Sequence, residues 1–525
     1  MKPSSDPAGR RAGHGDTPPL LELRGITKTF GDVTANRGVD FTLGAGEVVG
    51  LLGENGAGKT TLMNIAFGLY RPDAGTIRID GKAVNLRSTA DSIELGLNMV
   101  HQHAHSVPTH TVLENLMVGL PAHNGFLDRR RATARLEQIR QAYGLHLDPH
   151  RPVSTLAVGE KQRLDIIRAL YRKVKVLIFD EPTSVLTPQE TQGLFAAIRA
   201  LQADGVGIVY ISHKLNEVRE ITSRVVVMRA GEVVADRRND GALTNAGLAT
   251  LMCGEEPERI ARKNHERGEV RLEVANLRLH AAGGRHKGAD PIDFALHAGE
   301  IVGLAGVSGN GQVRFAEILA GVERAGSGEI RVDGKLVAAP SPRRMQALGV
   351  AYIPEDRIGV GLVGALSTGE NLVISRFGDE PFSRLGWLRL SAIRDFAARQ
   401  IADYDVRPAN PDIAVSLLSG GNQQKVIVAR ELSWSPRILV IAQPTRGLDV
   451  NSAAFVHRAL LRLREQNCAI LLISDDLDEI FQLSDRIAVM YENTVVIDTP
   501  AETATTIGIG LAMTGAARQA VGQPA

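Results

Sequence analysis

Cysteine and aromatic residues are scarce in this chain of 525 residues. Cys253 and Cys468 are the only cysteines, and they lie far apart in no metal-ligand spacing, while Phe, Trp and Tyr together make up 4% of the sequence. Two such cysteines are typical of free, buried thiols in a reducing cytoplasm. The sequence therefore predicts neither a disulfide framework nor a cysteine-bound metal.

The chain also lacks an excess of charge and long apolar runs. Lys and Arg number 60 against 59 Asp and Glu, so the net charge of +1 favours neither nucleic acid nor an anionic membrane, although it says nothing of a local basic patch. The longest apolar runs, such as AILLIS, have the length of strands and fall far short of the roughly 18 residues of a membrane-spanning helix. We expect a soluble or peripheral protein.

What the chain does have is an internal repeat. LGLNMVHQ, which starts at Leu95, matches LGVAYIPE, which starts at Leu348, at an offset of 253 residues. LAVGEKQR from Leu156 matches LSGGNQQK from Leu418 at an offset of 262, and EPTSVLT and YISHKLNEV match QPTRGLD and LISDDLDEI at the same offset. The two constant offsets indicate one duplication, with about nine extra residues in the middle of the second copy.

At an average of roughly 150 residues per domain, a chain of this length would form three or four domains. The duplication favours two large domains instead. In both copies, short β-branched runs such as EVVGLLG and KVLIFD alternate with longer amphipathic segments, which is typical of an α/β fold with a largely parallel sheet. The predicted boundaries are a disordered tail at 1–18, domains at 19–254 and 269–515, a charged linker at 255–268 and a second tail at 516–525.

GENGAGKTT, from Gly53 to Thr61, follows an apolar strand-like run and opens a predicted helix, which is the expected context of a P-loop. Such a loop wraps its backbone amides around phosphates, while its lysine reaches the β- and γ-phosphates and its hydroxyl binds Mg²⁺. ATP and Mg²⁺ are therefore the predicted ligands. The predicted contacts are Gly53, Glu54, Asn55, Gly56, Ala57, Gly58, Lys59, Thr60 and Thr61.

Two adjacent acids end the apolar run VLIFDEP. We expect Asp180 in the metal shell and Glu181 beside the water that attacks the γ-phosphate. The alternative, that the acids merely cap a strand, is disfavoured because uncompensated acids at a buried strand end are costly.

Three further candidates rest on position alone. His213, just past another strand-like run, is placed to hold the γ-phosphate and the attacking water, and Gln102 to sense the metal and that water. Phe30 is a candidate for stacking on adenine. A structural histidine and a core aromatic in an edge strand stay open as the alternatives.

The order of P-loop, Gln102, LAVGEKQR, acidic pair and His213, with LSGGNQQK in the second copy, resembles the ATP-binding cassette (ABC) ATPases. More narrowly, PEDRIGVGLV, LSGGNQQK and QPTRGLDV resemble the double-cassette ATPases of bacterial importers for simple sugars and nucleosides, and VGEKQR with EPTSVLTPQE leans toward the nucleoside (basic membrane lipoprotein) branch. The resemblance implies two tandem P-loop NTPase domains, each with a mainly parallel sheet, an antiparallel β part and a helical subdomain.

In that family the cassettes lie head to tail, so each ATP is held between the P-loop of one and the signature loop of the other. The resemblance implies that Ser419, Gly420, Gly421 and Asp449 of the second copy complete the site of the first. The second P-loop keeps Gly306, Gly309 and Gly311 but has Gln312 for lysine and Val313 for the magnesium hydroxyl. Ala442 and Gln443 replace the acids, Glu355 and Asp475 replace Gln102 and His213, and Ala157 replaces the signature serine.

These replacements predict hydrolysis at the first site only. Loss of one lysine charge about 4 Å from a phosphate removes on the order of 4 kcal/mol at an effective dielectric of 20. Whether the second site binds nucleotide stays open.

The resemblance implies an energising ATPase that sits peripherally on the cytoplasmic face of the bacterial inner membrane. Its partners would be integral-membrane permease subunits, bound through segments such as TVLENL and STGENL, and indirectly an external substrate-binding lipoprotein, with no nucleic acid. A soluble double-cassette ABC ATPase acting on ribosomes or DNA is the alternative, disfavoured by the short linker and the single intact site. The transported substrate, nucleoside or sugar, stays open.

Overall fold

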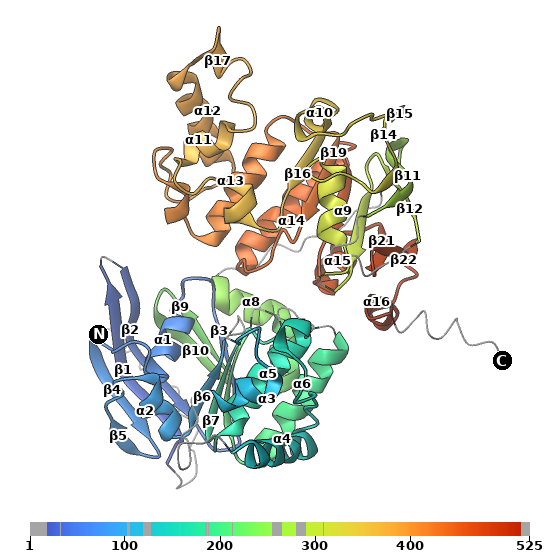
Figure 1. Ribbon diagram of the computed structural model, residues 1–525. Helices are drawn as coiled ribbons and strands as arrows, with labels where there is room; N and C mark the ends of the chain where they lie inside the picture. Colours follow the sequence, from blue (N-terminus) through green and yellow to red (C-terminus); the bar gives the residue numbers. More distant parts are fainter. Residues whose placement is uncertain are drawn as a thin grey trace, which may run out of the picture. The chain divides into compact units, whose positions relative to one another are not determined.

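The computed structural model describes residues 18–31, 33–101, 106–118, 128–156, 158–183, 186, 188–212, 214–254, 265–279, 290–307 and 309–515. Within this part the chain forms two compact units: the residues up to 183 with 193–252 form the first, and the residues of 185–192 with those from Cys253 onward form the second (Figure 1). The predictions for Gln102, His213, Ala157, both tails and most of the linker lie outside the described residues.

The first unit is built on a six-stranded sheet of order β10-β9-β3-β8-β7-β6, in which only β10 is antiparallel to its neighbour. Its inner strands, such as VVGLL and GIVYI, are buried along their whole length, because a parallel sheet is covered on both faces. The strands are β3 (Val48–Leu52), β6 (Leu97–Val100), β7 (Val176–Asp180), β8 (Gly207–Ile211), β9 (Arg224–Arg229) and β10 (Glu232–Arg238).

A four-stranded antiparallel sheet of order β2-β1-β4-β5 completes the β structure of this unit. Helix α4 begins at an Asp128 cap and ends at Gly144, whose φ of 69° is left-handed. The strands are β1 (Leu21–Phe30), β2 (Val33–Leu43), β4 (Ala74–Ile79) and β5 (Lys82–Val84); the helices are α1 (Lys59–Ala66), α2 (Thr89–Glu94), α3 (Val112–Met117), α4 (Arg129–Tyr143), α5 (Val158–Tyr171), α6 (Pro188–Ala203), α7 (Leu215–Ile221) and α8 (Asn245–Cys253).

The second unit repeats this plan strand for strand. Its large sheet has the order β16-β19-β20-β13-β21-β22 and its antiparallel sheet the order β12-β11-β14-β15. The strands are β11 (Val270–Arg278), β12 (Ile292–His297), β13 (Ile301–Ala305), β14 (Ser327–Val332), β15 (Lys335–Leu336), β16 (Val350–Ile353), β19 (Ile438–Ala442), β20 (Ala469–Ile473), β21 (Arg486–Tyr491) and β22 (Thr494–Pro500).

The second unit also contains a small hairpin of β17 (Ser383–Arg384) and β18 (Trp387–Leu388). It lies in the stretch where the offset between the copies changes, and residues 119–127 of the first copy, between α3 and α4, lie outside the described residues. The helices are α9 (Gln312–Leu319), α10 (Pro342–Ala347), α11 (Thr368–Val373), α12 (Leu390–Asp403), α13 (Gly420–Leu432), α14 (Val450–Glu465), α15 (Leu477–Leu483) and α16 (Thr506–Met513), with a π-helical turn at Arg357–Gly361.

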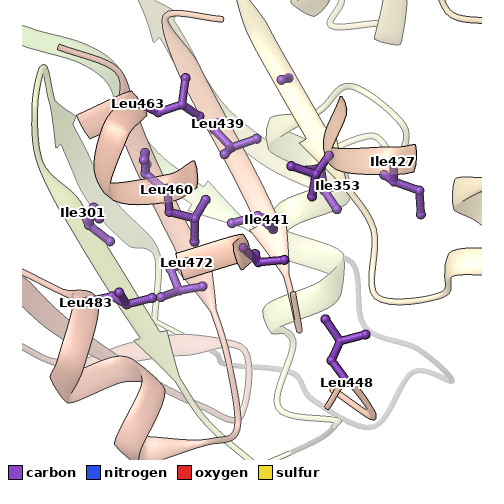
Figure 2. Packing of buried hydrophobic residues seen from close by; sticks show 14 of the residues in the cluster. Ile301, Ile353, Ile427, Leu439, Ile441, Leu448, Leu460, Leu463, Leu472 and Leu483 are labelled. Atoms are coloured by element: carbon purple, nitrogen blue, oxygen red, sulfur yellow. The ribbon is translucent and has the colours of Figure 1, made fainter. Parts of the chain in front are cut away.

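Aliphatic side chains fill the space between sheet and helices. Figure 2 shows Leu460 and Leu463 of α14 beside Leu439, Ile441 and Leu472 of the strands, all buried in one cluster. Each such side chain contributes about 1.5–3 kcal/mol when it leaves water. This core holds the ends of β19 and β20 in fixed positions. In the part of the chain that is described, every helix is too short or too polar to cross a bilayer.

Candidate active site

The loop between β3 and α1 is shaped by close backbone contacts. Gly53 and Gly58 have φ of 149° and 95°, and a Cβ at either would lie 2.2 Å from a carbonyl oxygen, that of Met228 or of Ala35. Only glycine fits such positions. Gly58 is also the residue before α1, so the first amides of this helix are oriented toward the loop, where an anion is stabilised.

Lys59 is held across this loop. Its Nζ donates to the carbonyl oxygens of Gly53 at 2.6 Å and Glu54 at 2.9 Å. The side chain is half-buried, which keeps the ammonium group at the loop while leaving room for a phosphate oxygen to replace a carbonyl. Lys59 thus contacts the loop that the sequence predicts to bind phosphate, and its role there stays a prediction.

Thr60 and Asp180 come together at the end of β7. The Thr60 hydroxyl donates to the Asp180 carboxylate, and Lys59 adds a favourable charge nearby. Burial, followed by repulsion from Glu181, nevertheless raises the pKa of Asp180 to about 6. A carboxylate and a hydroxyl are the hard oxygen donors that Mg²⁺ takes together with phosphates. Among the described residues no group of three or more His, Cys, Asp or Glu could hold a metal ion.

Glu181 follows on a left-handed turn. Its φ is 50°, unusual for a residue with a side chain, and its N–H donates to the Ile211 carbonyl at 2.9 Å. The turn ends the strand geometry directly after Asp180. Strained backbone of this kind is concentrated at functional sites.

Sequence reasoning missed the residue that supports this region. The carboxylate of Glu217 accepts hydrogen bonds from the Thr183 hydroxyl at 2.6 Å and from the Tyr210 hydroxyl at 2.8 Å. It therefore joins the loop after Glu181 to β8 and α7. The repeat carries a signal for it, because Glu479 occupies the same place in the second copy and accepts from Thr445 at 2.8 Å.

The second unit keeps the backbone of the phosphate loop and changes its chemistry. Gly309 and Gly311 have φ of 97° and 106°, and α9 begins at Gln312 as α1 begins at Lys59. The buried Gln312 donates from Nε2 to the Val307 carbonyl at 3.2 Å, the counterpart of the contact from Lys59 to Glu54. The glutamine thus reproduces a hydrogen bond of the lysine without its charge.

A cavity of about 390 Å³ lies at this loop within the second unit. The predicted second-site residues that line it are Gly306, Gly309, Gly311, Gln312, Glu355 and Gln443. Arg314, Glu317 and Glu323 also line it, so its wall carries more negative than positive side chains. A triphosphate bound in this cavity would face these acids without a P-loop lysine to offset their charge, because Gln312 stands at that position.

The residues that replace the catalytic groups in the second unit are bonded to other side chains of that unit. Gln443 keeps the left-handed turn of Glu181, with φ of 49° and an N–H bond to the Ile473 carbonyl at 2.7 Å. With its amide oriented so that nitrogen faces Asp475 Oδ1, the two groups are 2.8 Å apart. Glu355 pairs with Arg446. The negative charge expected from Glu355 is therefore partly compensated inside the unit.

The signature residues and Asp449 lie near one another in the second unit. Ser419 caps α13, and its Oγ accepts from the side-chain amide of Asn422 at 2.9 Å. Asp449 caps α14 through the backbone of Ser452 at 2.7 Å, and a Cβ at Gly421 would meet the Ser452 hydroxyl at 2.5 Å. Ser419, Gly420 and Gly421 thus lie at the start of α13, close to Asp449 at the start of α14.

Arg357 is a second residue that sequence reasoning missed. Its Nη1 lies 3.5 Å from the Gly420 carbonyl, and burial together with the charge of Arg446 lowers its pKa. It falls in the quoted PEDRIGVGLV segment, but its approach to the signature loop depends on a long-range contact that no local pattern reveals.

Phe30 ends β1 with 44% of its surface exposed. Its ring meets Tyr70 edge to face at 5.4 Å, and Lys28 Nζ lies 5.4 Å from its centroid. The interpretation of Phe30 as a core aromatic is wrong, because the strand extends past the core. Stacking on adenine stays a prediction.

Residues 36–184 and 289–446 match the family model of the ABC transporter. The chain belongs to the ABC transporter family. It is 38% identical to a nucleoside import ATP-binding protein of Lactococcus lactis subsp. cremoris, over 94% of this chain and 98% of that one. It is 39% identical to a guanosine import ATP-binding protein of Bacillus subtilis (96% and 99% covered) and 39% identical to a ribose import ATP-binding protein of Rubrobacter xylanophilus (95% and 98% covered).

A solved structure, RNase-L Inhibitor, superimposes with a TM-score of 0.62 at 21% identity over 94% of this chain and 93% of that one. At this identity the likeness concerns the fold alone. The predicted fold class, two tandem ABC cassettes of α/β type, is confirmed. As a member of this family the chain is an ATP-binding protein and an ATPase.

Proposed function

We propose that this chain is the ATP-hydrolysing subunit of a bacterial ABC importer, which couples hydrolysis at one site to uptake of a nucleoside or simple sugar through separate permease subunits. The observation that carries the proposal is the asymmetry of the units. The first holds a P-loop lysine, a Thr60–Asp180 pair and Glu181 at one strand end, whereas the second has neutral Gln312 and Gln443 in the same backbone positions.

In the proposed mechanism the first unit binds the triphosphate along the loop from Gly53 to Thr61. Lys59 exchanges a loop carbonyl for a phosphate oxygen. Thr60 and Asp180 would hold Mg²⁺, which would neutralise phosphate charge. Glu181 accepts the proton of the attacking water. Gln102 and His213 are assigned by family position to the metal and to the γ-phosphate.

By resemblance to the family, we assign residues of the second unit to the same site. Ser419, Gly420 and Gly421 supply donors at the start of α13, and Asp449 orders the adjoining loop. Their closeness at the starts of α13 and α14 supports the assignment. The second unit's own loop does not hydrolyse ATP, because Gln312 supplies no charge and Gln443 no base.

Two matching helix starts are the proposed contacts with two permease subunits. Thr111 and Glu114 form a capping box at α3, and Ser367 and Glu370 form the same box at α11. Asn115 and Asn371 fasten each helix to the preceding loop, accepting from Val107 at 2.8 Å and Val363 at 2.9 Å. The chain would then lie on the cytoplasmic face of the inner membrane, reaching an external substrate-binding lipoprotein only through the permease and binding no nucleic acid.

Affinity purification tests this function. The tagged full-length chain, isolated from detergent-solubilised membranes of its own cells with the Glu181→Gln variant as a matched sample, should retain permease subunits in stoichiometric amount. ATP should increase retention in the variant because bound nucleotide persists. Recovery with ribosomes or DNA instead would favour the soluble double-cassette alternative and contradict the importer. Uptake assays with labelled nucleosides and pentoses would then identify the substrate.

A further inference from the structure

The second unit exposes an apolar tip on the hairpin of β17 and β18. We call residues 383–390, which comprise β17, β18 and the start of α12, the hairpin tip. Leu385 is 93% exposed, Trp387 81% and Leu390 70%, and Leu388 is also exposed. Figure 1 shows β17 projecting beyond α11 and α12. Single exposed apolar residues are ordinary, but four within six residues form a patch that needs a reason.

The tip stands on a rigid base. Phe382, directly before it, is 2% exposed and meets the Phe396 ring at 4.9 Å. Val373 and Ile393 close the same cluster, and the Arg389 N–H donates to the Phe382 carbonyl at 2.8 Å. The buried side chains therefore explain how the hairpin folds, and they leave the apolar tip pointing away from the unit that anchors it.

Folding does not explain the residues of the turn. Leu385 and Gly386 have φ of 52° and 83°, so both central positions are left-handed. Asparagine, aspartate or glycine adopts this turn readily, whereas leucine is strained there and gains no burial. A strained and exposed leucine points to a ligand outside the unit.

The charges at the tip have one sign. Arg384 and Arg389 are exposed, and the segment from 383 to 390 contains no acid. The acids beside it are engaged or outside the tip: Asp379 pairs with Arg376 and Asp412 with Arg394, while Glu380 and Asp395 lie in the flanking segments. Apolar side chains between two cations match the interface of an anionic bilayer, where tryptophan and leucine enter the headgroup region and arginine binds phosphate.

We propose that the hairpin tip inserts directly into an anionic lipid bilayer. A lipid surface fits better than a protein surface because the tip is convex and short, whereas a stable protein interface buries about 800 Å² on each partner. A few apolar anchors with basic neighbours are enough for a peripheral membrane contact. This goes beyond the proposed function, because it assigns lipid as a partner that binds without the permease.

Tryptophan fluorescence gives a direct test, because the chain has only two tryptophans. The Trp434→Phe variant leaves Trp387 as the sole reporter in the full-length protein. Vesicles of phosphatidylcholine with phosphatidylglycerol should shift its emission to the blue, and brominated acyl chains should quench it. Vesicles of phosphatidylcholine alone should give a weaker effect, since Arg384 and Arg389 then lack anionic partners.

Variants separate the apolar and charged contributions. Leu385→Ser and Leu388→Ser should each lower vesicle partitioning about tenfold, and Arg384→Gln with Arg389→Gln should lower it about tenfold for the anionic vesicles only. Ile507→Ser is the matched control, because Ile507 is a similarly exposed aliphatic residue on α16. All variants should keep the thermal midpoint and the ATPase rate of the parent.

Two outcomes would overturn the proposal. If the serine variants partition as the parent and Ile507→Ser do, the tip does not contact lipid. If Trp387 shifts only in vesicles that also contain a co-purified permease, the tip docks on protein. Either result would leave the importer function standing, because that function is tested by co-purification and does not depend on the tip.

Discussion

Asp180 is the acid whose protonation matters most for metal binding. Burial and the neighbouring Glu181 raise its pKa to about 6, against the stabilising Thr60 hydroxyl and Lys59 charge. A proton therefore occupies the carboxylate in the folded protein at pH values where an unfolded aspartate is already ionised. Above about pH 6 the folded protein bears the cost of a buried charge, and below about pH 4 it does not.

Asp180→Asn should therefore stabilise the metal-free protein in a pH-dependent way. We expect a gain of about 1–3 kcal/mol in the free energy of unfolding at pH 8, falling toward zero at pH 4, together with loss of Mg²⁺-dependent hydrolysis. Urea unfolding in EDTA at several pH values measures this, and the pH 4 data serve as the internal control. If the gain in unfolding free energy were the same at every pH, the pKa of Asp180 would not be raised in the folded protein.

At the scale of elements, the phosphate loop depends on how closely β2 approaches it. Ala35 and Asn36 on β2 lie against Gly58, where a Cβ would be 2.2 Å from the Ala35 carbonyl. Asn36 Nδ2 also donates to the Gly58 carbonyl at 3.1 Å. The antiparallel sheet thus fixes the residue from which α1 starts.

Gly58→Ala and Gly56→Ala separate this contact from backbone strain. Both glycines have left-handed φ, 95° and 83°, but nothing lies within 4 Å of a Cβ at Gly56. Gly56→Ala should cost about 1 kcal/mol in unfolding free energy, from strain alone, and Gly58→Ala about 2–4 kcal/mol. Urea unfolding without nucleotide measures both. Equal costs would mean that the approach of β2 does not constrain the loop.

Buried runs and glycine spacing made most of the elements predictable. EVVGLL and VLIFD are recognisable as strands from their own composition, and the repeat transfers each assignment to the other copy. The repeat marks Glu217 through Glu479 but does not reveal its partners, and the Arg357 contact was not predictable at all, because both contacts join residues of different elements. The hairpin at Ser383–Leu388 was missed as well, since its two short strands carry no alternation that a sequence pattern can detect.

At the scale of the whole molecule, the two cassettes share a backbone and differ in chemistry. The repeat followed from the sequence because matching motifs recur at fixed offsets. The family and the α/β class followed from the motifs and from the alternation of strand-like and helical segments. The compensation of Glu355 by Arg446 did not, because charge alone does not reveal a pairing partner. The proposed division of labour, with catalysis in one cassette and signature in the other, stays a prediction that variants can test.

Ser419→Arg and Ala157→Arg are the matched pair for that test. Each places a bulky cation at the signature position of one cassette, and only Ser419 is assigned to the intact site. Ser419→Arg should lower the ATPase rate at least about 100-fold, as Glu181→Gln should, while Ala157→Arg and Gln443→Ala keep most of it. Phosphate release assays measure the rates, and equal losses from both arginines would contradict a single catalytic site.

The left-handed turn at Gln443 has a consequence for engineering the second cassette. Gln443 keeps the φ of Glu181, 49° against 50°, so the main chain that would carry a carboxylate there already has the required conformation. Likewise α9 begins at Gln312 as α1 begins at Lys59. Gln443→Glu and Gln312→Lys would therefore change the charge of this loop without requiring a new backbone.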